Sequence, residues 1–378
     1  MRTAIGGKRR NGTLVWSCVA LTIGLLTDLE ATAGVIYVKA DSAPGGDGAS
    51  WATACGQLED GLAKANANDS VWVAAGTYYP TEGSNRGASF TLQPGVAVYG
   101  GFAGNETDAG QCDPDRHRTV LSGDVGKTGE ASDNCYHVVV GADGAALSGF
   151  TITGGHADGM GYDGKGGGMI NYRRGAQIRP NSPTAVGYSV AVSACVFADN
   201  YARDGGAIYN YDRSEPKFTS CVFTHNRAEN GGAVLDRVGV KARYEDCQFI
   251  ANTAWWRGGA VYFDYGARPA MTDCVFRDNE TSGHGGALHS VSRASPCGRG
   301  FQTIPLKLTL EGSAGCLAGS PSALGLAREL PRGLSWCAVA ALVMLGNEMQ
   351  LRAGQPALLL GRRGFWSETD RQWWAVRA

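Results

Sequence analysis

Aromatic and acidic side chains recur at equivalent positions of neighbouring segments in this chain, and such residues could hold a carbohydrate. If Ile208 and Val261 point into a core, alternation along a strand turns Tyr209 and Tyr262 outward on one face. Flat rings can pack against the apolar C–H face of a sugar, and carboxylates can accept hydrogen bonds from its hydroxyl groups. The candidate glycan-binding residues are Tyr209, Tyr262, Tyr211, Asp236, Asp264, Trp255 and Trp256, with Tyr265, Phe263 and Asn210 nearby.

A simpler interpretation of these residues stays open. Aromatic side chains are favoured in strands because they suit a pleated, half-buried surface. A row of half-exposed strand residues would give the same pattern without any ligand.

A polysaccharide lyase or glycoside hydrolase, acting in a groove, is the alternative from a different class. A lyase needs a base beside a sugar α-proton and cations that stabilise the developing charge. A hydrolase needs two carboxyl groups about 5 to 10 Å apart, and Asp236 and Asp264 occupy nearby positions in adjacent segments. The sequence assigns no catalytic residue, although a lyase could draw on Arg173, Arg174, Arg203, Arg213, Asp158, Asp163, Asp204 and Asp212.

Patterns for metal binding are weak. Residues 156–163 are rich in Gly and Asp, so Asp158 and Asp163 offer oxygen ligands for Ca²⁺, but the regular D-x-D-x-D-G spacing is missing. The spacings typical of zinc ligands are missing too. We therefore expect no cofactor.

The elements that must position these residues repeat along the chain. A C-x-F-x-x-N segment occurs four times, with its cysteines 26, 26 and 27 residues apart: Cys195–Asn200, Cys221–Asn226, Cys247–Asn252 and Cys274–Asn279. A Gly-Gly-Ala-aliphatic segment follows each copy, at Gly205–Ile208, Gly231–Val234, Gly258–Val261 and Gly285–Leu288.

The spacing of the repeat predicts a single-stranded parallel β-helix, an all-β solenoid. Cys-x-Phe alternates with period two, as a strand with one buried face does. About 26 residues accommodate three short strands and three turns, which is one coil, and coils stack at roughly 4.8 Å. Equivalent residues should then form structural ladders: Asn200, Asn226, Asn252 and Asn279 at a turn, and Phe197, Phe223, Phe249 and Phe276 inside.

The repeated motifs resemble the right-handed parallel β-helix (pectin-lyase-like) superfamily, especially bacterial exported proteins with polymorphic-outer-membrane-protein-like repeats. The resemblance covers residues 35 to 290. Because that superfamily includes lyases, hydrolases, adhesins and inert scaffolds, it implies the fold more than the function. Upstream it rests on Ile36–Val38, Gly46–Gly48, Ser50–Trp51, Val71–Tyr78, Tyr99–Phe102 and Leu147–Gly155.

Cysteine usage suggests two environments. Cys195, Cys221, Cys247 and Cys274 occupy an inward ladder position and should be buried free thiols, because parallel Cβ vectors are poor geometry for a bridge. A disulfide among Cys55, Cys112 and Cys135 is an open alternative in an oxidising compartment.

Residues 1–33 have the features of a secretory signal peptide: a basic start, an apolar run at Leu14–Leu26 and small residues at Ala31–Ala33. We therefore expect a secreted or cell-surface protein with no transmembrane span after signal removal. The net charge of −1 gives no reason to bind nucleic acid, so the expected partner is an extracellular polysaccharide or a host or cell-surface component.

Three further regions follow the predicted signal. Residues 34–146 should form an N-terminal cap and the first irregular coils, with a short capping helix within 55–66, and residues 147–292 the regular coils. In residues 293–378 the turn and strand signals disappear together, so we expect an atypical tail outside the fold, either frame-shifted or disordered. A helical cap built on Leu334–Leu345 is the alternative. The leading hypothesis for function is a scaffold for adhesion or glycan contact without turnover.

Overall fold

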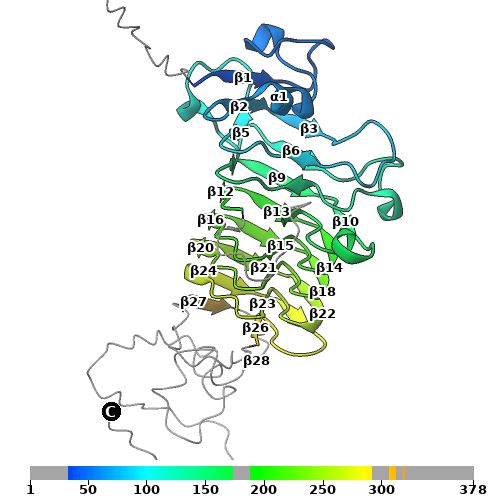
Figure 1. The fold of residues 1–378 in the computed structure, drawn as a ribbon, viewed down its shortest axis with the longest axis vertical. Helices are drawn as coiled ribbons and strands as arrows, with labels where there is room; N and C mark the ends of the chain where they lie inside the picture. Colours follow the sequence, from blue (N-terminus) through cyan, green and yellow to red (C-terminus); the bar gives the residue numbers. More distant parts are fainter. Residues whose placement is uncertain (1–32, 173–187, 292–305, 312–317, 320–378) are drawn as a thin grey trace, which may run out of the picture. The chain divides into compact units, whose positions relative to one another are not determined.

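The structure, a computed structural model, describes residues 33–172, 188–291, 306–311 and 318–319. Its strands pair in parallel with their equivalents in the preceding and following coils, and they form four rows that run through the stack (Figure 1). Parallel stacking with the side chains of like residues in register is the arrangement that the repeat predicts.

The first two rows meet at β24 (Ala270–Arg277), so they belong to one 15-stranded sheet. The first row contains β1 (Val35–Val38), β2 (Ser70–Ala74), β5 (Ala97–Phe102), β8 (Ala146–Ser148), β12 (Ala191–Ser193), β16 (Lys217–Thr219), β20 (Arg243–Glu245) and β24. The second row contains β3 (Gly76–Tyr78), β6 (Thr119–Ser122), β9 (Phe150–Thr153), β13 (Val196–Ala198), β17 (Val222–Thr224), β21 (Gln248–Ile250) and the end of β24.

The remaining rows are separate sheets of five and eight strands. The third row contains β10 (His156–Ala157), β14 (Tyr201–Asp204), β18 (Arg227–Asn230), β22 (Thr253–Arg257) and β25 (Glu280–Thr281). The fourth row contains β4 (Phe90–Thr91), β7 (Val139–Val140), β11 (Met169–Asn171), β15 (Ile208–Tyr211), β19 (Val234–Arg237), β23 (Val261–Asp264), β26 (Leu288–Ser290) and β28 (Ala318–Gly319).

A regular coil has four short strands rather than the three that the sequence predicts. The additional break lies between the first and second rows, where Ala194 has φ 48° and its equivalents Ser220, Asp246 and Asp273 have φ 51–53°. A left-handed residue turns the backbone sharply and ends a strand, and it is uncommon outside glycine. Because these positions are not glycines, composition did not reveal the turn.

Two predicted ladders run along the interior. Asn226 accepts hydrogen bonds from the backbone N–H and the Nδ2 of Asn200, and its own Nδ2 donates to Phe197 O and to Asn252 Oδ1. The rings of Phe197, Phe223, Phe249 and Phe276 stack with centroids 5.3, 4.8 and 4.6 Å apart. The Asn ladder thus satisfies buried backbone groups where each coil turns.

The two glycines of each Gly-Gly-Ala segment are needed for different reasons. Gly231 has φ 62°, which disfavours any side chain. A Cβ on Gly232 would lie 2.0 Å from Gly259 O, so the second glycine permits the close approach of stacked backbones.

The seven described cysteines are free thiols. Cys195, Cys221, Cys247 and Cys274 are fully buried, and each donates a weak hydrogen bond to a backbone carbonyl of the preceding coil. The outlying Cys55, Cys112 and Cys135 are free as well, which leaves the alternative of a disulfide among them without support in this structure.

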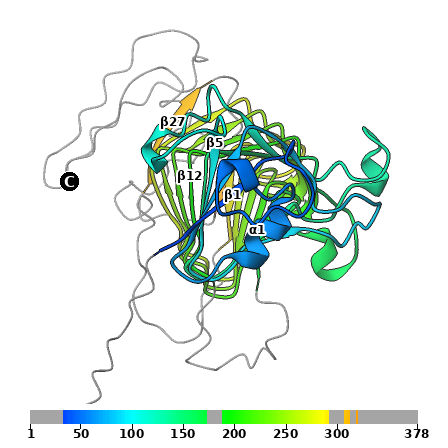
Figure 2. The same ribbon diagram turned by 90° about the horizontal axis from the view of Figure 1, so that it is seen from above.

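A short helix lies at the N-terminal end of the stack, as predicted. α1 (Leu58–Lys64) buries Leu58 and Leu62 in the main core and lies beside β1 (Figures 1 and 2). It packs so closely that a Cβ on Gly61 would meet the side chain of Val38 at 2.5 Å. The short 3₁₀ helices are η1 (Trp51–Thr53), η2 (Ala109–Gln111), η3 (Ala131–Asp133) and η4 (Gly161–Gly164).

Two short backbone segments of the predicted tail pair with strands of the last coil. β27 (Leu306–Glu311) pairs with β24, and β28 pairs with β26. The last coil of a parallel β-helix has unpaired N–H and C=O groups that can accept a further strand. The rest of 293–378, like the predicted signal peptide up to residue 32, lies outside the described residues.

Candidate functional site

The outward face of the fourth row carries a column of aromatic and aliphatic side chains. Ile170, Tyr209, Leu235, Tyr262 and His289 are neighbours in register on successive strands. Their alternation partners Ile208, Val234 and Val261 lie in the main core, whereas Ile170, Tyr209, Leu235 and Tyr262 form a separate apolar cluster. The outward orientation predicted for Tyr209 and Tyr262 is therefore correct.

These outward residues are more buried than the sequence suggested. Tyr209 is 1% exposed and Tyr262 is 3% exposed, because neighbouring aromatic side chains pack over the column. Tyr211 lies beside Tyr209, with ring centroids 5.9 Å apart, and Tyr172 lies 5.9 Å from Tyr211. Tyr162 stacks on Tyr172 at 3.7 Å.

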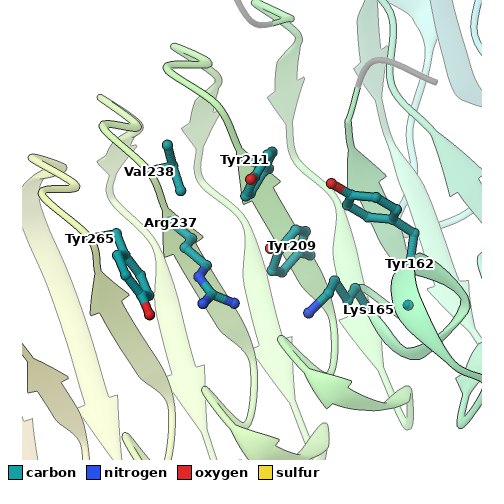
Figure 3. A pocket seen from close by; sticks show the side chains of 8 residues that line it. Tyr162, Lys165, Tyr209, Tyr211, Arg237, Val238 and Tyr265 are labelled. Atoms are coloured by element: carbon teal, nitrogen blue, oxygen red, sulfur yellow. The ribbon is translucent and has the colours of Figure 1, made fainter. Parts of the chain in front are cut away.

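A pocket of about 440 Å³ opens on this face, and we call it the tyrosine pocket (Figure 3). Although Tyr209 has almost no exposed surface, its ring forms part of the pocket wall, so the residue contributes more to shape than to open contact. The residues that line the pocket are Gly161, Tyr162, Lys165, Tyr209, Tyr211, Arg237, Val238 and Tyr265.

Two cations from different coils enter the tyrosine pocket. The Nζ of Lys165 lies 4.9 Å from the centre of the Tyr209 ring, and the guanidinium of Arg237 lies 4.4 Å from that of Tyr265. In Figure 3 both cationic head groups point into the same space beside Tyr209. Each cation is therefore held against the ring of a tyrosine that lines the pocket.

Each cation is also held by an aspartate. Lys165 pairs with Asp204 at 2.6 Å, and the Nε of Arg237 lies 3.7 Å from Asp264. Neither aspartate lines the pocket. Since Asp264 faces Nε, the outer edge of the Arg237 guanidinium stays directed into the pocket (Figure 3).

Two phenols of the tyrosine pocket, those of Tyr209 and Tyr162, stay protonated near neutral pH. Burial raises the pKa of Tyr209 well above its usual value. Burial, together with the neighbouring Tyr172, does the same to the pKa of Tyr162. These hydroxyls can therefore donate and accept hydrogen bonds, but they are unsuited to act as bases near neutral pH.

The structure divides the predicted glycan-binding residues among four places. Tyr209 and Tyr211 line the tyrosine pocket, and Asp264 supports Arg237 from outside it. Tyr262 continues the outward column, where its hydroxyl accepts a hydrogen bond from Arg257 at 3.3 Å. Trp255 and Trp256 lie on β22 in the third row, away from the lining of the pocket.

Asp236 lies in a fourth place, the interior of the solenoid, so the expectation that it faces a ligand is wrong. It is fully buried, as is Asn210, whose Nδ2 donates to Asp236 Oδ1 at 2.6 Å. Alternation explains this, because Leu235 points outward and the next residue must point inward. Asp236 and Asp264 therefore point to opposite faces of the fourth row and cannot form the carboxyl pair of a hydrolase.

Sequence reasoning missed Tyr162, Lys165, Arg237 and Val238 as residues of the pocket. The alternation that places Tyr209 and Leu235 outward also places Tyr211 and Arg237 outward, so Arg237 could have been found. Tyr162 and Lys165 come from the irregular segment around η4, where no period exists to place them.

The charged residues considered for a lyase or for calcium are largely engaged elsewhere. Asp158 is bound by Arg86 at 2.7 Å, so its charge is already neutralised. Arg203 donates to the backbone oxygen of Asp158, and Asp212 pairs with Arg213. Within the described residues no cluster of three ligating side chains could hold a metal ion. Arg173 and Arg174 lie outside the described residues.

Comparisons with known proteins agree with the fold. Residues 136–296 match the family described as "Right handed beta helix region". This match covers less than half of the chain, and it agrees with the parallel β-helix of the described residues, the class to which its motifs pointed. The narrower resemblance to bacterial exported proteins stays a prediction.

Two further comparisons are uninformative about function. No curated protein matches the sequence. The crystal structure of the pectin methylesterase from Aspergillus niger in deglycosylated form matches with 13% identity and a TM-score of 0.32, covering 77% of this chain and 87% of that chain. Likeness at this level supports no functional argument. Among the described helices, none is long and apolar enough to cross a membrane.

Proposed function

We propose that this protein is an exported β-helix scaffold that binds a carboxylate-bearing glycan in the tyrosine pocket without turning it over. The observation that carries the proposal is the convergence of Lys165 and Arg237 on one tyrosine-lined space. Two like charges that face each other favour an anion between them. The planar guanidinium of Arg237 suits a carboxylate in particular.

The dimensions of the tyrosine pocket favour a chain of sugars over one small ion. Its lining comes from four consecutive coils: the segment before β11, then β15, β19 and the turn after β23. Coils stack at roughly 4.8 Å, so the pocket extends about 14 Å along the stack. Tyrosine rings supply stacking surfaces along this length, and their hydroxyls can bond sugar hydroxyls.

The chemistry of the described lining favours binding over hydrolysis. Among the described residues that line the tyrosine pocket, none is a carboxylate or a histidine. A retaining or inverting hydrolase needs a pair of carboxyl groups beside the bond that it cleaves. The proposal places this scaffold outside the cell because of the basic, apolar and small-residue pattern at its N-terminus.

Arg237→Gln and Lys165→Gln are each expected to weaken binding to polygalacturonate by about tenfold or more, because each removes a charge-assisted hydrogen bond. Affinity electrophoresis in gels that contain the polysaccharide measures the change. Lys241→Gln is the matched control, since Lys241 is exposed and pairs with Glu215 outside the pocket.

Two results would contradict this proposal. One is equal binding of polygalacturonate and of its carboxyl-reduced form, because the cations would then have no role. The other is the appearance of reducing ends or of the absorbance of unsaturated uronates, which would establish an enzyme instead.

A further inference from the structure

The strand β22 contains a bulge relative to the preceding strand β18, and the following coil keeps the additional residue. Ala228 pairs with Ala254, but Asn230 pairs with Arg257, so β22 has one more residue than β18 over the same distance. The additional residue accounts for the interval of 27 between Cys247 and Cys274. A bulge bends a strand and changes the direction of the side chains within it.

Two tryptophans occupy this bulge. Trp255 is 53% exposed and Trp256 is 64% exposed, whereas large apolar residues of the repeat are otherwise mostly buried. Both therefore present indole rings to solvent on the outer face of the third row. Trp255 also contacts Tyr201 edge-on, with ring centroids 6.2 Å apart.

The surroundings of the two tryptophans are polar. At the corresponding position of the preceding coils, between a buried alanine and the end of the strand, stand Arg203 on β14 and Glu229 on β18. Arg227 and Glu280 are exposed on the same row. The indoles thus form an aromatic island among charges of both signs.

We propose that Trp255 and Trp256 form a second, separate binding site, which takes the uncharged face of a neutral polysaccharide. Flat indole rings offer an apolar surface to a pyranose ring, and Glu229 on the adjacent strand β18 can bond its hydroxyls. Adjacent charges of opposite sign give no preference for an acidic or a basic ligand. A sugar-binding site combines aromatic surface with a few polar groups in this way.

The apolar area around the two tryptophans is too small for a protein to be the ligand of this site. A stable protein interface buries about 800 Å² on each partner, with an apolar core from which charged residues are depleted. Around Trp255 and Trp256 the exposed neighbours on the same row are charged instead, as Arg203, Arg227 and Glu280 are. A single chain of sugars needs no wider apolar surface than the two rings supply.

The experiment uses the purified full-length chain and soluble galactomannan and mixed-linkage β-glucan as probes. We expect at least one of them to retard the protein in affinity electrophoresis and to shift its tryptophan fluorescence to shorter wavelength. In the double variant Trp255→Ala, Trp256→Ala, we expect affinity to fall at least tenfold and the fluorescence shift to disappear. The control is Tyr79→Ala, which removes another exposed aromatic residue, 41% exposed, at a different place.

The results of this test can be distinguished from the results of the binding test at the tyrosine pocket. Arg237→Gln should leave binding of neutral polysaccharide unchanged, whereas the double tryptophan variant should still bind polygalacturonate. The inference is overturned if neither neutral polysaccharide binds or if the double variant binds as the parent does. It is also overturned if sedimentation detects self-association that depends on the two tryptophans, since a second copy would then be the occupant.

Discussion

Replacing Asn226 by alanine is expected to lower the free energy of unfolding by about 3 to 5 kcal/mol. The side chain of Asn226 satisfies a backbone N–H and an amide from Asn200, and it donates to Phe197 O and to Asn252 Oδ1. Alanine would leave several of these buried groups without partners. Each unsatisfied buried group costs about 1 to 3 kcal/mol, and relaxation of the structure recovers part of the sum.

Chemical denaturation followed by circular dichroism measures this loss as a lower midpoint. Asn230→Ala is the matched control in the same coil, because Asn230 is half-buried and its side chain donates one hydrogen bond, to Asp204. We expect that control to cost about 1 kcal/mol or less. Equal effects of the two substitutions would mean that the ladder contributes nothing particular to stability.

The interior of the solenoid was predictable because it repeats. A residue such as Asn226 or Phe223 must stack on its own kind in the next coil, so the spacing of 26 residues places it in three dimensions. Alternation then separates core from surface within each strand. The number of strands per coil was not predictable, because Ala194 and Asp246 adopt left-handed φ without being glycines.

The outer face was predictable only in part. Alternation along the strand predicts that Tyr209 and Tyr262 point outward. The same alternation, applied to every residue of the strand, would also have placed Asp236 inside and Arg237 outside. Asp236 was predicted to lie at the surface because buried carboxylates are rare. The hydrogen bond from Asn210 that makes this burial possible joins two coils and is not visible along the sequence.

The bulge at Trp255 and Trp256 was visible in the sequence only as a longer repeat interval. The interval of 27 residues indicated one insertion, yet it did not tell whether the residue lay in a turn or in a strand. Inner ladders must match from coil to coil, whereas the outward-facing columns can vary. Binding sites in such a fold are therefore expected where an outward column departs from the repeat. Both proposed sites lie on outer columns, and the site at Trp255 and Trp256 lies at such a departure.

The contribution of the buried Asp236 carboxyl to the stability of this protein is expected to fall as pH rises from about 4 to about 7. Burial raises the pKa of Asp236 to about 7, and hydrogen bonds from Asn210 and Tyr244 offset only part of this effect. Its neighbour in the next coil is Phe263, and among the described residues it forms no ion pair. The folded protein therefore favours the protonated carboxylic acid.

The direction follows from proton binding in the two states. The unfolded chain releases this proton near pH 3.8, whereas the folded chain keeps it up to about pH 7. Between these values the unfolded state holds fewer protons, so rising pH favours unfolding, and above pH 7 the loss is complete. A shift of about three pKa units corresponds to at most about 4 kcal/mol.

Asp236→Asn keeps the shape of the side chain and removes its titration. Near pH 4 we expect the variant to match the parent within about 1 kcal/mol, and at pH 8 we expect it to be more stable by about 2 to 4 kcal/mol. Denaturation curves at several pH values test this, with Asp278→Asn as an exposed control. Between pH 4 and 8 the free energies of unfolding of the parent and of Asp236→Asn should diverge. If the two curves run parallel instead, Asp236 does not titrate in this range and the prediction is wrong.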